Sequence, residues 1–308
     1  MIRVTGHFGE LLQGRIGPSG QIALVTLPCP SLGVVARHTP GTGLTLHKES
    51  QLIVSFDRMC MFLQDLRLSL SGQVELHAEM PVGGGAGAST AALVALARLA
   101  GYRGKPQTLA AACIATEGAS DPLMFNRPEQ LLWGSRIGNR LAQLPELPRF
   151  EVIGGFYGPP CLTDAADNDF PDITSLIPRW IAAAQARDLA SLAALATHSA
   201  KCTMKMRKPQ SDPTASLARQ LGALGYVIAH TGSARGLIFA PDEVPLRARC
   251  CKMPVCTGSC NSLPVVRDEF CCNDVDRGGF GSGFWVAYSD LCGDRASCYL
   301  DGGPNQYA

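Results

Sequence analysis

The clearest alternation of hydrophobic and polar residues runs from Gln73 to Glu79. Its alternate positions separate into an apolar and a polar set, which predicts a strand with one solvent-facing side in an antiparallel sheet. Further strands are predicted at 2–5 and 21–27, around a turn at 17–20 that holds two glycines and a proline. A second hairpin is predicted from 34–38 and 44–47.

Apolar residues at helical spacing predict helices over 51–66, 89–100, 106–116, 171–198 and 213–224. Strands are predicted at 150–156, at 225–230 and, after a glycine turn, at 237–240. Strands come first along the chain and then mix with helices, so we predict an α+β fold. A length of 308 residues suggests two lobes.

The composition narrows the class of protein. Hydrophobic residues make up 46% and charged residues 17%, a composition typical of a folded globular chain. A net charge of +1 and 6% aromatic residues argue against nucleic acid or an anionic membrane as a partner. The longest apolar helical run, 91–99, contains Arg98 and is about half of a membrane span. We therefore expect a cytoplasmic protein, and the sequence leaves its oligomeric state open.

The thirteen cysteines are unevenly distributed. Five are scattered over residues 1–246, and the other eight crowd into positions 250–298, where no helical period is visible. Cys256 and Cys260 have the spacing of zinc ligands, but no matching second pair follows. A disulfide-stapled appendage does not suit a cytosolic chain. We favour a tail that is foreign to the fold and translated out of frame, which the coding DNA would test.

A glycine-rich segment carries the strongest chemical signal. Four glycines precede a Ser-Thr pair that opens an Ala/Leu-rich helix, whose N-terminus attracts phosphate through free N–H groups. A P-loop would need a lysine that is missing here, and a dinucleotide fingerprint would need a buried parallel strand before it. The segment consists of Pro81, Val82, Gly83, Gly84, Gly85, Ala86, Gly87, Ala88, Ser89, Thr90 and Ala91.

Three motifs together resemble those of the GHMP kinases, which include galactokinase, homoserine kinase and mevalonate kinase. Pro81, Gly85, Ser89 and Ala91 match the pattern of that family's ATP motif. Residues 6–14, Gly-His-Phe-Gly-Glu-Leu-Leu-Gln-Gly, resemble its first motif, in a form most similar to the L-threonine kinases of cobalamin synthesis. Residues 229–237 resemble its third motif. The family usually has two consecutive serines where this chain has Ala88 and Ser89.

The resemblance implies an N-terminal lobe with a left-handed βαβ unit over 1–125 and a ferredoxin-like C-terminal lobe over 126–245. The tail over 246–308 then stands where a terminal helix and strand are expected. The resemblance also implies ATP and Mg²⁺ as cofactors and a small-molecule acceptor. By this likeness the reaction is phosphorylation of the L-threonine hydroxyl to O-phospho-L-threonine.

Two carboxylates follow the helix predicted at 106–116. Phosphoryl transfer needs Mg²⁺ on the phosphates and often a base near the acceptor. By likeness to the threonine-kinase subfamily, Glu117 would bind Mg²⁺ with Ser89, and Asp121 would orient or deprotonate the substrate hydroxyl. A polar turn that ends a helix is the alternative interpretation of both residues.

Four other residues are candidates for substrate binding. Glu10 in the first motif would pair with the amino group of an amino acid. His7, Gly232 and Ser233 come from the first and third motifs and would line the same pocket. The alternatives that remain open are a kinase for another small alcohol such as homoserine, and a degenerate protein that binds nucleotide without turnover.

Overall fold

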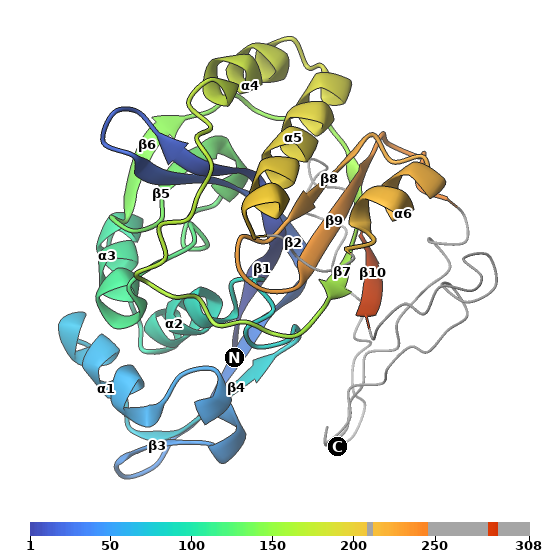
Figure 1. The fold of residues 1–308 in the computed structure, drawn as a ribbon. Coiled ribbons are helices and arrows are strands. Elements are labelled where there is room, and N and C mark those ends of the chain that lie inside the picture. The colour runs from blue at the N-terminus through green and yellow to red at the C-terminus, as the bar shows by residue number, and fades with distance from the viewer. Residues whose placement is uncertain (208–211, 246–282, 289–308) are drawn as a thin grey trace.

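The computed structural model of the chain describes residues 1–207 and 212–245, together with the backbone of 283–288. A curled sheet of mixed strand direction forms its centre, and helices pack against it (Figure 1). The predicted α+β class is therefore confirmed. The sheet runs without a break through both predicted lobes, whose division at 125 and 126 stays a prediction.

The strand order is β10-β7-β9-β8-β1-β2-β4-β3, and the β5–β6 hairpin is attached to β2. The strands are β1 (Ile2–Ile16), β2 (Gln21–Thr39), β3 (Leu44–Leu46), β4 (Gly72–Ala78), β5 (Leu131–Gly134), β6 (Asn139–Gln143), β7 (Glu151–Tyr157), β8 (Gly225–Ile228), β9 (Ala234–Phe239) and β10 (Gly283–Tyr288).

Strands β1 and β2 form a long antiparallel hairpin that joins the two ends of the sheet. Its turn is closed by a hydrogen bond from the Gly20 N–H to the Gly17 carbonyl (3.1 Å), which confirms the turn predicted there. On its other edge β1 meets β8, where Glu10 lies opposite Ile228. Strand β1 therefore lies in the interior of the sheet, between β8 and β2.

The second predicted hairpin, 34–38 with 44–47, is wrong. Strand β4 lies between these two segments and pairs antiparallel with β2 and parallel with β3. Pro40 follows β2 directly and has no N–H to continue a hairpin ladder. The alternation predicted for β4 is confirmed, because Val74 and Leu76 are buried while Gln73 and His77 are exposed.

The helices are α1 (Phe56–Asp65), α2 (Ala88–Leu99), α3 (Pro106–Glu117), α4 (Leu176–Gln185), α5 (Leu189–Arg207) and α6 (Thr214–Gln220), with 3₁₀ turns at Lys48–Leu52 and Pro128–Gln130. The single helix predicted over 171–198 is wrong, because α4 and α5 are separated by a break. Arg187 adopts a φ of 53° at this break, and the Asp188 carboxylate caps α5 by accepting the Ser191 N–H at 3.0 Å.

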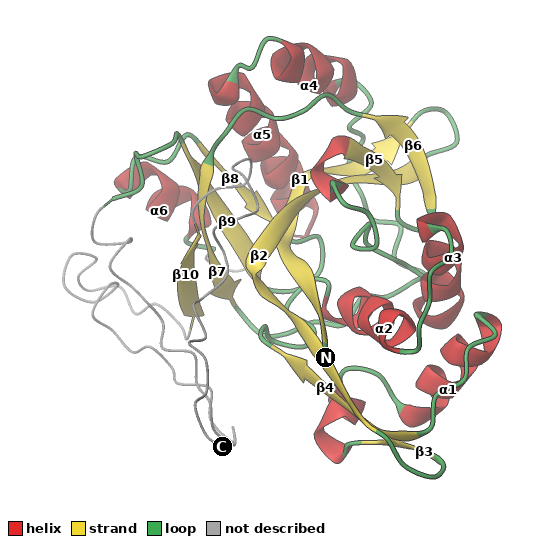
Figure 2. Cartoon of the chain, turned by 180° about the vertical axis from the view of Figure 1, so that it is seen from behind, coloured by secondary structure: helices red, strands yellow, loops and turns green. Residues whose placement is uncertain are grey.

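Helix α2 is the centre of the hydrophobic core. It packs on β1 and β2, whereas α5 packs on β1 and β8, so the two helices approach the same strand (Figure 2). Every residue from Thr90 to Ala97 is buried. Burying a leucine such as Leu93 or Leu96 stabilises the fold by about 1.5–3 kcal/mol. The core therefore fixes the start of α2 against β1, which is where the first two motifs lie.

Two parts of the sheet are not predicted by the sequence pattern. The β5–β6 hairpin is short and shows no alternation, and β10 comes from the cysteine-rich tail. A tail foreign to the fold predicts no terminal strand here, yet residues 283–288 pair antiparallel with β7 at the edge of the sheet. The other predictions for the tail concern residues outside the described part of the chain. Within the described part of the chain, no helix has both the length and the apolar character of a membrane span.

Candidate active site

The glycine-rich segment forms the loop between β4 and α2. Gly87 has a φ of 75° at the N-cap of α2, and its lack of a side chain leaves the first N–H groups of the helix without a side-chain cap. The Ser89 hydroxyl oxygen is buried in this first turn and has no hydrogen-bond partner among the described residues. Free N–H groups beside an unpartnered hydroxyl fit a phosphate and its metal ion.

The loop is held from two sides by the other two motifs. The Gly84 carbonyl accepts N–H hydrogen bonds from Ser233 (2.9 Å) and Ala234 (2.8 Å), and the Ala86 carbonyl accepts one from His7 (3.1 Å). Gly85 has a φ of 72°, and a Cβ there would lie 1.9 Å from the Thr231 carbonyl oxygen. The three motifs, far apart in the sequence, thus meet at the N-terminus of α2.

The two third-motif candidates support this loop through their backbones. Gly232 has a φ of 89°, and a Cβ there would lie 2.5 Å from the Gly84 carbonyl carbon. Ser233 is buried, donates its N–H to Gly84 and accepts the Tyr157 N–H at 2.8 Å. Their observed contacts are with the loop itself, so a role in substrate binding stays a prediction.

His7 and Glu10 are buried and form a cluster beside the loop with Asp121, which is partly exposed. Nδ1 of His7 lies 3.6 Å from Oε1 of Glu10, and Nε2 of His7 lies 3.4 Å from Oδ2 of Asp121. Irregular register in β1 between positions 7 and 12 allows His7 and Glu10, three residues apart on one strand, to face the same side. The structure therefore brings together three of the residues that the sequence singles out.

Local hydrogen bonds hold Asp121 in this position. Helix α3 ends at Gly118, which has a φ of 75°, and the chain then turns back toward α2. The Ser120 N–H donates to the Ser135 carbonyl (3.0 Å), and the Trp133 indole N–H donates to the Ser120 carbonyl (2.7 Å). The Asp121 N–H donates to the Thr90 hydroxyl at 3.3 Å, which joins it to the first turn of α2.

The charges of His7, Glu10 and Asp121 influence one another. Burial opposes the imidazolium of His7, but the charges of Asp121 and Glu10 outweigh it and raise the pKa of His7 to about 9. The Gly9 N–H donates to Nδ1 at 3.1 Å when that nitrogen carries no proton, whereas the charge of Glu10 favours a proton on Nδ1. His7 therefore serves as the counter-ion of the two carboxylates.

The two carboxyl groups differ in their ionisation. Burial raises the pKa of Glu10 to about 7, and the Asp121 charge adds to this against the opposing charge of His7. Burial would also raise the pKa of Asp121, but His7, the Thr90 hydroxyl and the charge of Arg136 outweigh it and lower that pKa. Asp121 is thus the ionised carboxylate of the cluster, suited to accept a hydrogen bond from a hydroxyl group.

Glu117 lies apart from this cluster. Both of its carboxylate oxygens are 3.3 Å from Nη1 of Arg58 in α1. The group of possible metal ligands within 4.8 Å of one another, among the described residues, consists of His7, Glu10 and Asp121 and does not include Glu117. A Mg²⁺ ion held by Ser89 and Glu117 would therefore compete with Arg58 for the carboxylate.

A second cluster, not predicted from the sequence, lies on the segment 158–172 that follows β7. Asp167 contacts Arg207 of α5, and its Oδ2 lies 3.2 Å from Nε2 of His230. The His230 ring stacks on Phe170 with ring centroids 3.5 Å apart. The same segment reaches the glycine-rich loop, where the Cys161 N–H donates to the Gly83 carbonyl at 2.7 Å.

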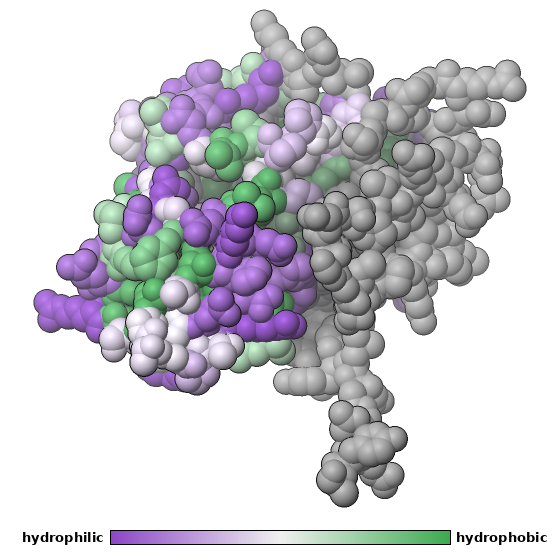
Figure 3. Space-filling model, turned by 90° about the horizontal axis from the view of Figure 1, so that it is seen from below, coloured by the Kyte–Doolittle hydropathy of each residue, from purple (hydrophilic) through white to green (hydrophobic). Residues whose placement is uncertain are grey.

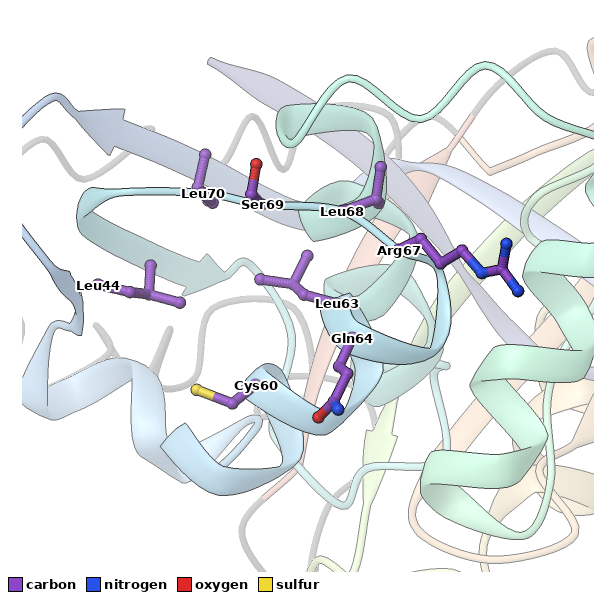
Figure 4. A pocket seen from close by; sticks show the side chains of 8 residues that line it. All are labelled: Leu44, Cys60, Leu63, Gln64, Arg67, Leu68, Ser69 and Leu70. Atoms are coloured by element: carbon purple, nitrogen blue, oxygen red, sulfur yellow. The ribbon is translucent and has the colours of Figure 1, made fainter.

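The molecule also has a surface hollow of about 350 Å³ that is remote from these motifs in the sequence. It is lined by β3, α1 and residues 67–70 (Figure 4). Figure 3 views the molecule from below, where hydrophobic residues are exposed between hydrophilic ones. Leucines dominate the lining, which includes no residue of the three motifs: Leu44, Cys60, Leu63, Gln64, Arg67, Leu68, Ser69 and Leu70.

Comparison with solved structures shows the fold of small-molecule kinases. The mevalonate kinase of Methanococcus jannaschii matches with a TM-score of 0.55 and 12% identity, over 79% of this chain and 91% of that one. The homoserine kinase of Cytophaga hutchinsonii matches with a TM-score of 0.52 and 16% identity, over 79% and 86%. L. major mevalonate kinase, in complex with R-mevalonate, matches with a TM-score of 0.53 and 14% identity, over 79% and 88%.

At these identities the likeness establishes a shared fold and no more. The fold predicted from the three motifs is thereby confirmed in its general architecture. No protein-family model matches the sequence, and no curated protein matches it.

Proposed function

We propose that the chain is an ATP- and Mg²⁺-dependent kinase of the GHMP type that phosphorylates the hydroxyl group of L-threonine. The product would be O-phospho-L-threonine, for cobalamin synthesis. The observation that carries the proposal is the contact between the glycine-rich loop and the cluster of His7, Glu10 and Asp121. A phosphate-binding loop and an acceptor-binding carboxylate must adjoin for direct phosphoryl transfer.

The residues present fit the proposed cofactors. The loop from Pro81 to Ala91 would hold the ATP phosphates with its N–H groups, and the buried Ser89 hydroxyl would face the metal ion. When bound, Mg²⁺ supplies positive charge to the phosphates that react. Glu117 is the second proposed ligand, and it would exchange its ion pair with Arg58 for the metal ion.

Asp121 would act on the acceptor. Its lowered pKa makes it a weak base at neutral pH, so its main task is to accept the hydrogen bond of the substrate hydroxyl and hold that oxygen toward the loop. The acceptor oxygen forms a bond to the γ-phosphorus while the bond from that phosphorus to ADP breaks. The hydroxyl proton leaves as this charge develops, toward Asp121 or water.

Glu10 and His7 would complete the acceptor pocket. A substrate ammonium group would stabilise the ionised form of Glu10, whose pKa burial raises to about 7. The His7 side chain touches Glu10, Asp121 and the loop at Gly87, where a Cβ would lie 2.7 Å from its ring. His7 would thus align the acceptor with the phosphates.

ADP release with a panel of acceptors tests the proposal. The full chain would be incubated with ATP, Mg²⁺ and L-threonine, L-serine, L-homoserine or mevalonate, and the product analysed by mass spectrometry. We expect the highest kcat/KM with L-threonine. A higher value with homoserine would keep the kinase but change the acceptor, and ATP binding without any turnover would establish a non-catalytic nucleotide-binding protein. Ala88 stands where the family usually has a serine, and the loss of that hydroxyl from the loop favours the non-catalytic alternative.

A further inference from the structure

Arg136 lies at the turn between β5 and β6, and only part of its guanidinium group has hydrogen-bond partners. Nη2 donates to the carbonyl oxygens of Asp164 (3.0 Å) and Asp167 (3.3 Å). Nε and Nη1 are buried and have no hydrogen-bond partner within the described residues. Buried donors without partners are rare, because each loses its hydrogen bonds to water without replacement.

The position of Arg136 relates it to the candidate active site. The neighbouring Ser135 carbonyl accepts the Ser120 N–H at 3.0 Å, which joins this turn to the residue before Asp121. The charge of Arg136 also acts on Asp121, whose pKa it helps to lower. The guanidinium is therefore held by the backbone carbonyls of Asp164 and Asp167, and its turn is hydrogen-bonded to the residue next to Asp121.

We propose that Arg136 binds the carboxylate of the acceptor, which makes the acceptor an amino acid with a hydroxyl group. This inference rests on the proposed function. Each group of such a substrate then has a partner of matching charge: Glu10 for the ammonium, Asp121 for the hydroxyl and Arg136 for the carboxylate. A neutral alcohol would leave the buried guanidinium nitrogens unsatisfied, so it would bind more weakly.

A carboxylate suits this position better than a phosphate of ATP. Three acidic side chains act on Arg136, namely Asp121, Asp164 and Asp167. They disfavour the approach of a group with several negative charges, whereas an amino acid also brings its own ammonium group. The phosphates would have the glycine-rich loop and Ser89 as partners at the first turn of α2, where the Asp121 N–H donates to Thr90.

The test compares L-threonine with L-threonine amide, which keeps the hydroxyl and the ammonium but has no carboxylate. The variants are Arg136→Met and Arg136→Lys, with Arg140→Met as the matched control on the exposed part of β6. We expect the wild-type protein to prefer L-threonine by about 10²-fold in kcat/KM, as a charge-assisted contact predicts. Arg136→Met should reduce this preference to about threefold or less.

The expected loss appears in KM for L-threonine, with KM for ATP unchanged. Arg136→Lys should restore part of the preference, because it keeps the charge but not the fork of donors. Arg140→Met should behave like the wild-type protein. Circular dichroism and thermal melting of each variant would separate loss of recognition from loss of folding.

Three results would overturn the inference. If Arg136→Met keeps its kinase activity and its preference for L-threonine over the amide, Arg136 does not contact the substrate carboxylate. If only the KM for ATP rises, Arg136 binds the phosphates instead. If the wild-type protein phosphorylates no acceptor, the proposed function fails. Calorimetry with L-threonine and its amide, without ATP, then decides on Arg136. We expect the same preference in affinity, and equal or absent binding of the two ligands contradicts the inference.

Discussion

Two histidines in this molecule each contact an aspartate, yet their environments drive them in opposite directions. His7 lies 3.4 Å from Asp121 and has its pKa raised to about 9. His230 lies 3.2 Å from Asp167, and burial together with the charge of Arg207 lowers its pKa to about 4. The distances to the aspartates are nearly equal, so a histidine–aspartate contact does not by itself determine the charge of the ring.

The second neighbour accounts for the difference. His7 has another carboxylate, Glu10, on the opposite side of its ring, which adds to the stabilisation of the cation. His230 instead has Arg207 in contact and stacks on Phe170. Burial and a positive neighbour both disfavour a charged imidazole. The first cluster is therefore a charged site beside the glycine-rich loop, and the second is a neutral brace for the segment 158–172.

The largest expected difference is between the two aspartates. Asp121→Asn should lower kcat by about 10²-fold or more with little change in ATP affinity, because it removes the charge that we propose orients the acceptor hydroxyl. Asp167→Asn should leave kcat within about threefold, since its side chain contacts Arg207 and His230, and its contact with Arg136 is made by the backbone carbonyl, which the substitution keeps. Steady-state kinetics at saturating ATP measures both. Equal losses in the two variants would abolish the functional distinction between the clusters.

The two histidines should contribute to stability with opposite dependence on pH. His7 binds a proton more tightly in the folded state, so its contribution is complete below pH 6.5 and is lost as pH rises to about 9. Its size is on the order of 3 kcal/mol at 1.36 kcal/mol per pKa unit. His230 is neutral when folded, so the stability it allows is present above pH 6.5 and is lost as pH falls toward 4.

Urea unfolding of the wild-type protein and of His7→Gln at pH 6.5 and pH 9 measures the first contribution. The free energy of unfolding should fall with pH more steeply in the wild-type protein. Between pH 4 and 6.5, His230 should make the free energy of unfolding rise with pH, and His230→Asn should weaken this rise. Glu10 contributes the opposite trend in this range, because its pKa is raised and its protonated form favours folding at low pH. The exposed His47→Gln is the control; parallel pH profiles for all four proteins would refute the assignment.

A smaller effect is expected from the glycine-rich loop, which the His7 N–H contacts at Ala86. Ser89→Ala should lower kcat by about tenfold and change ATP affinity less, because the N–H groups of the loop remain while a metal-facing oxygen is lost. Ser216→Ala in α6, whose hydroxyl donates to the Pro213 carbonyl at 2.9 Å, is a matched serine away from the loop. If kcat is unchanged in Ser89→Ala, this serine is not part of the site.

The smallest effect should come from Glu117. Glu117→Gln should raise the Mg²⁺ concentration needed for half-maximal activity by a few-fold, since one of two proposed protein ligands becomes neutral. Arg58→Ala should leave that requirement the same or lower it, because it frees the Glu117 carboxylate from its ion pair. A Mg²⁺ titration of activity distinguishes the two. An increase in Arg58→Ala alone would show that the ion pair, and not metal binding, is what Glu117 contributes.

The sequence predicts the elements of this site better than their arrangement. The glycine-rich loop, β4, α2 and α3 follow from local patterns, and His7, Glu10 and Asp121 are candidates on the basis of their motifs. Their mutual contact depends on the register of β1 and on the turn after α3, which side-chain periodicity does not encode.

Other features have no local signal at all. Arg136 is a single arginine in a short hairpin, and its unpartnered nitrogens are a property of the packed structure. The break between α4 and α5 interrupts an Ala/Leu-rich run, and only the Asp188 cap marks it. Long-range packing therefore determines which of the chemically plausible residues become neighbours.

The most direct test of the account is NMR of the two imidazole rings while L-threonine is added to the full chain. His7→Gln and His230→Asn assign the resonances. The account predicts that the His7 resonance shifts with saturation as the ligand binds beside Glu10 and Asp121, while the His230 resonance remains in place. A shift of His230 alone, or no shift of His7 at concentrations that saturate binding in calorimetry, would contradict the assignment of the acceptor site.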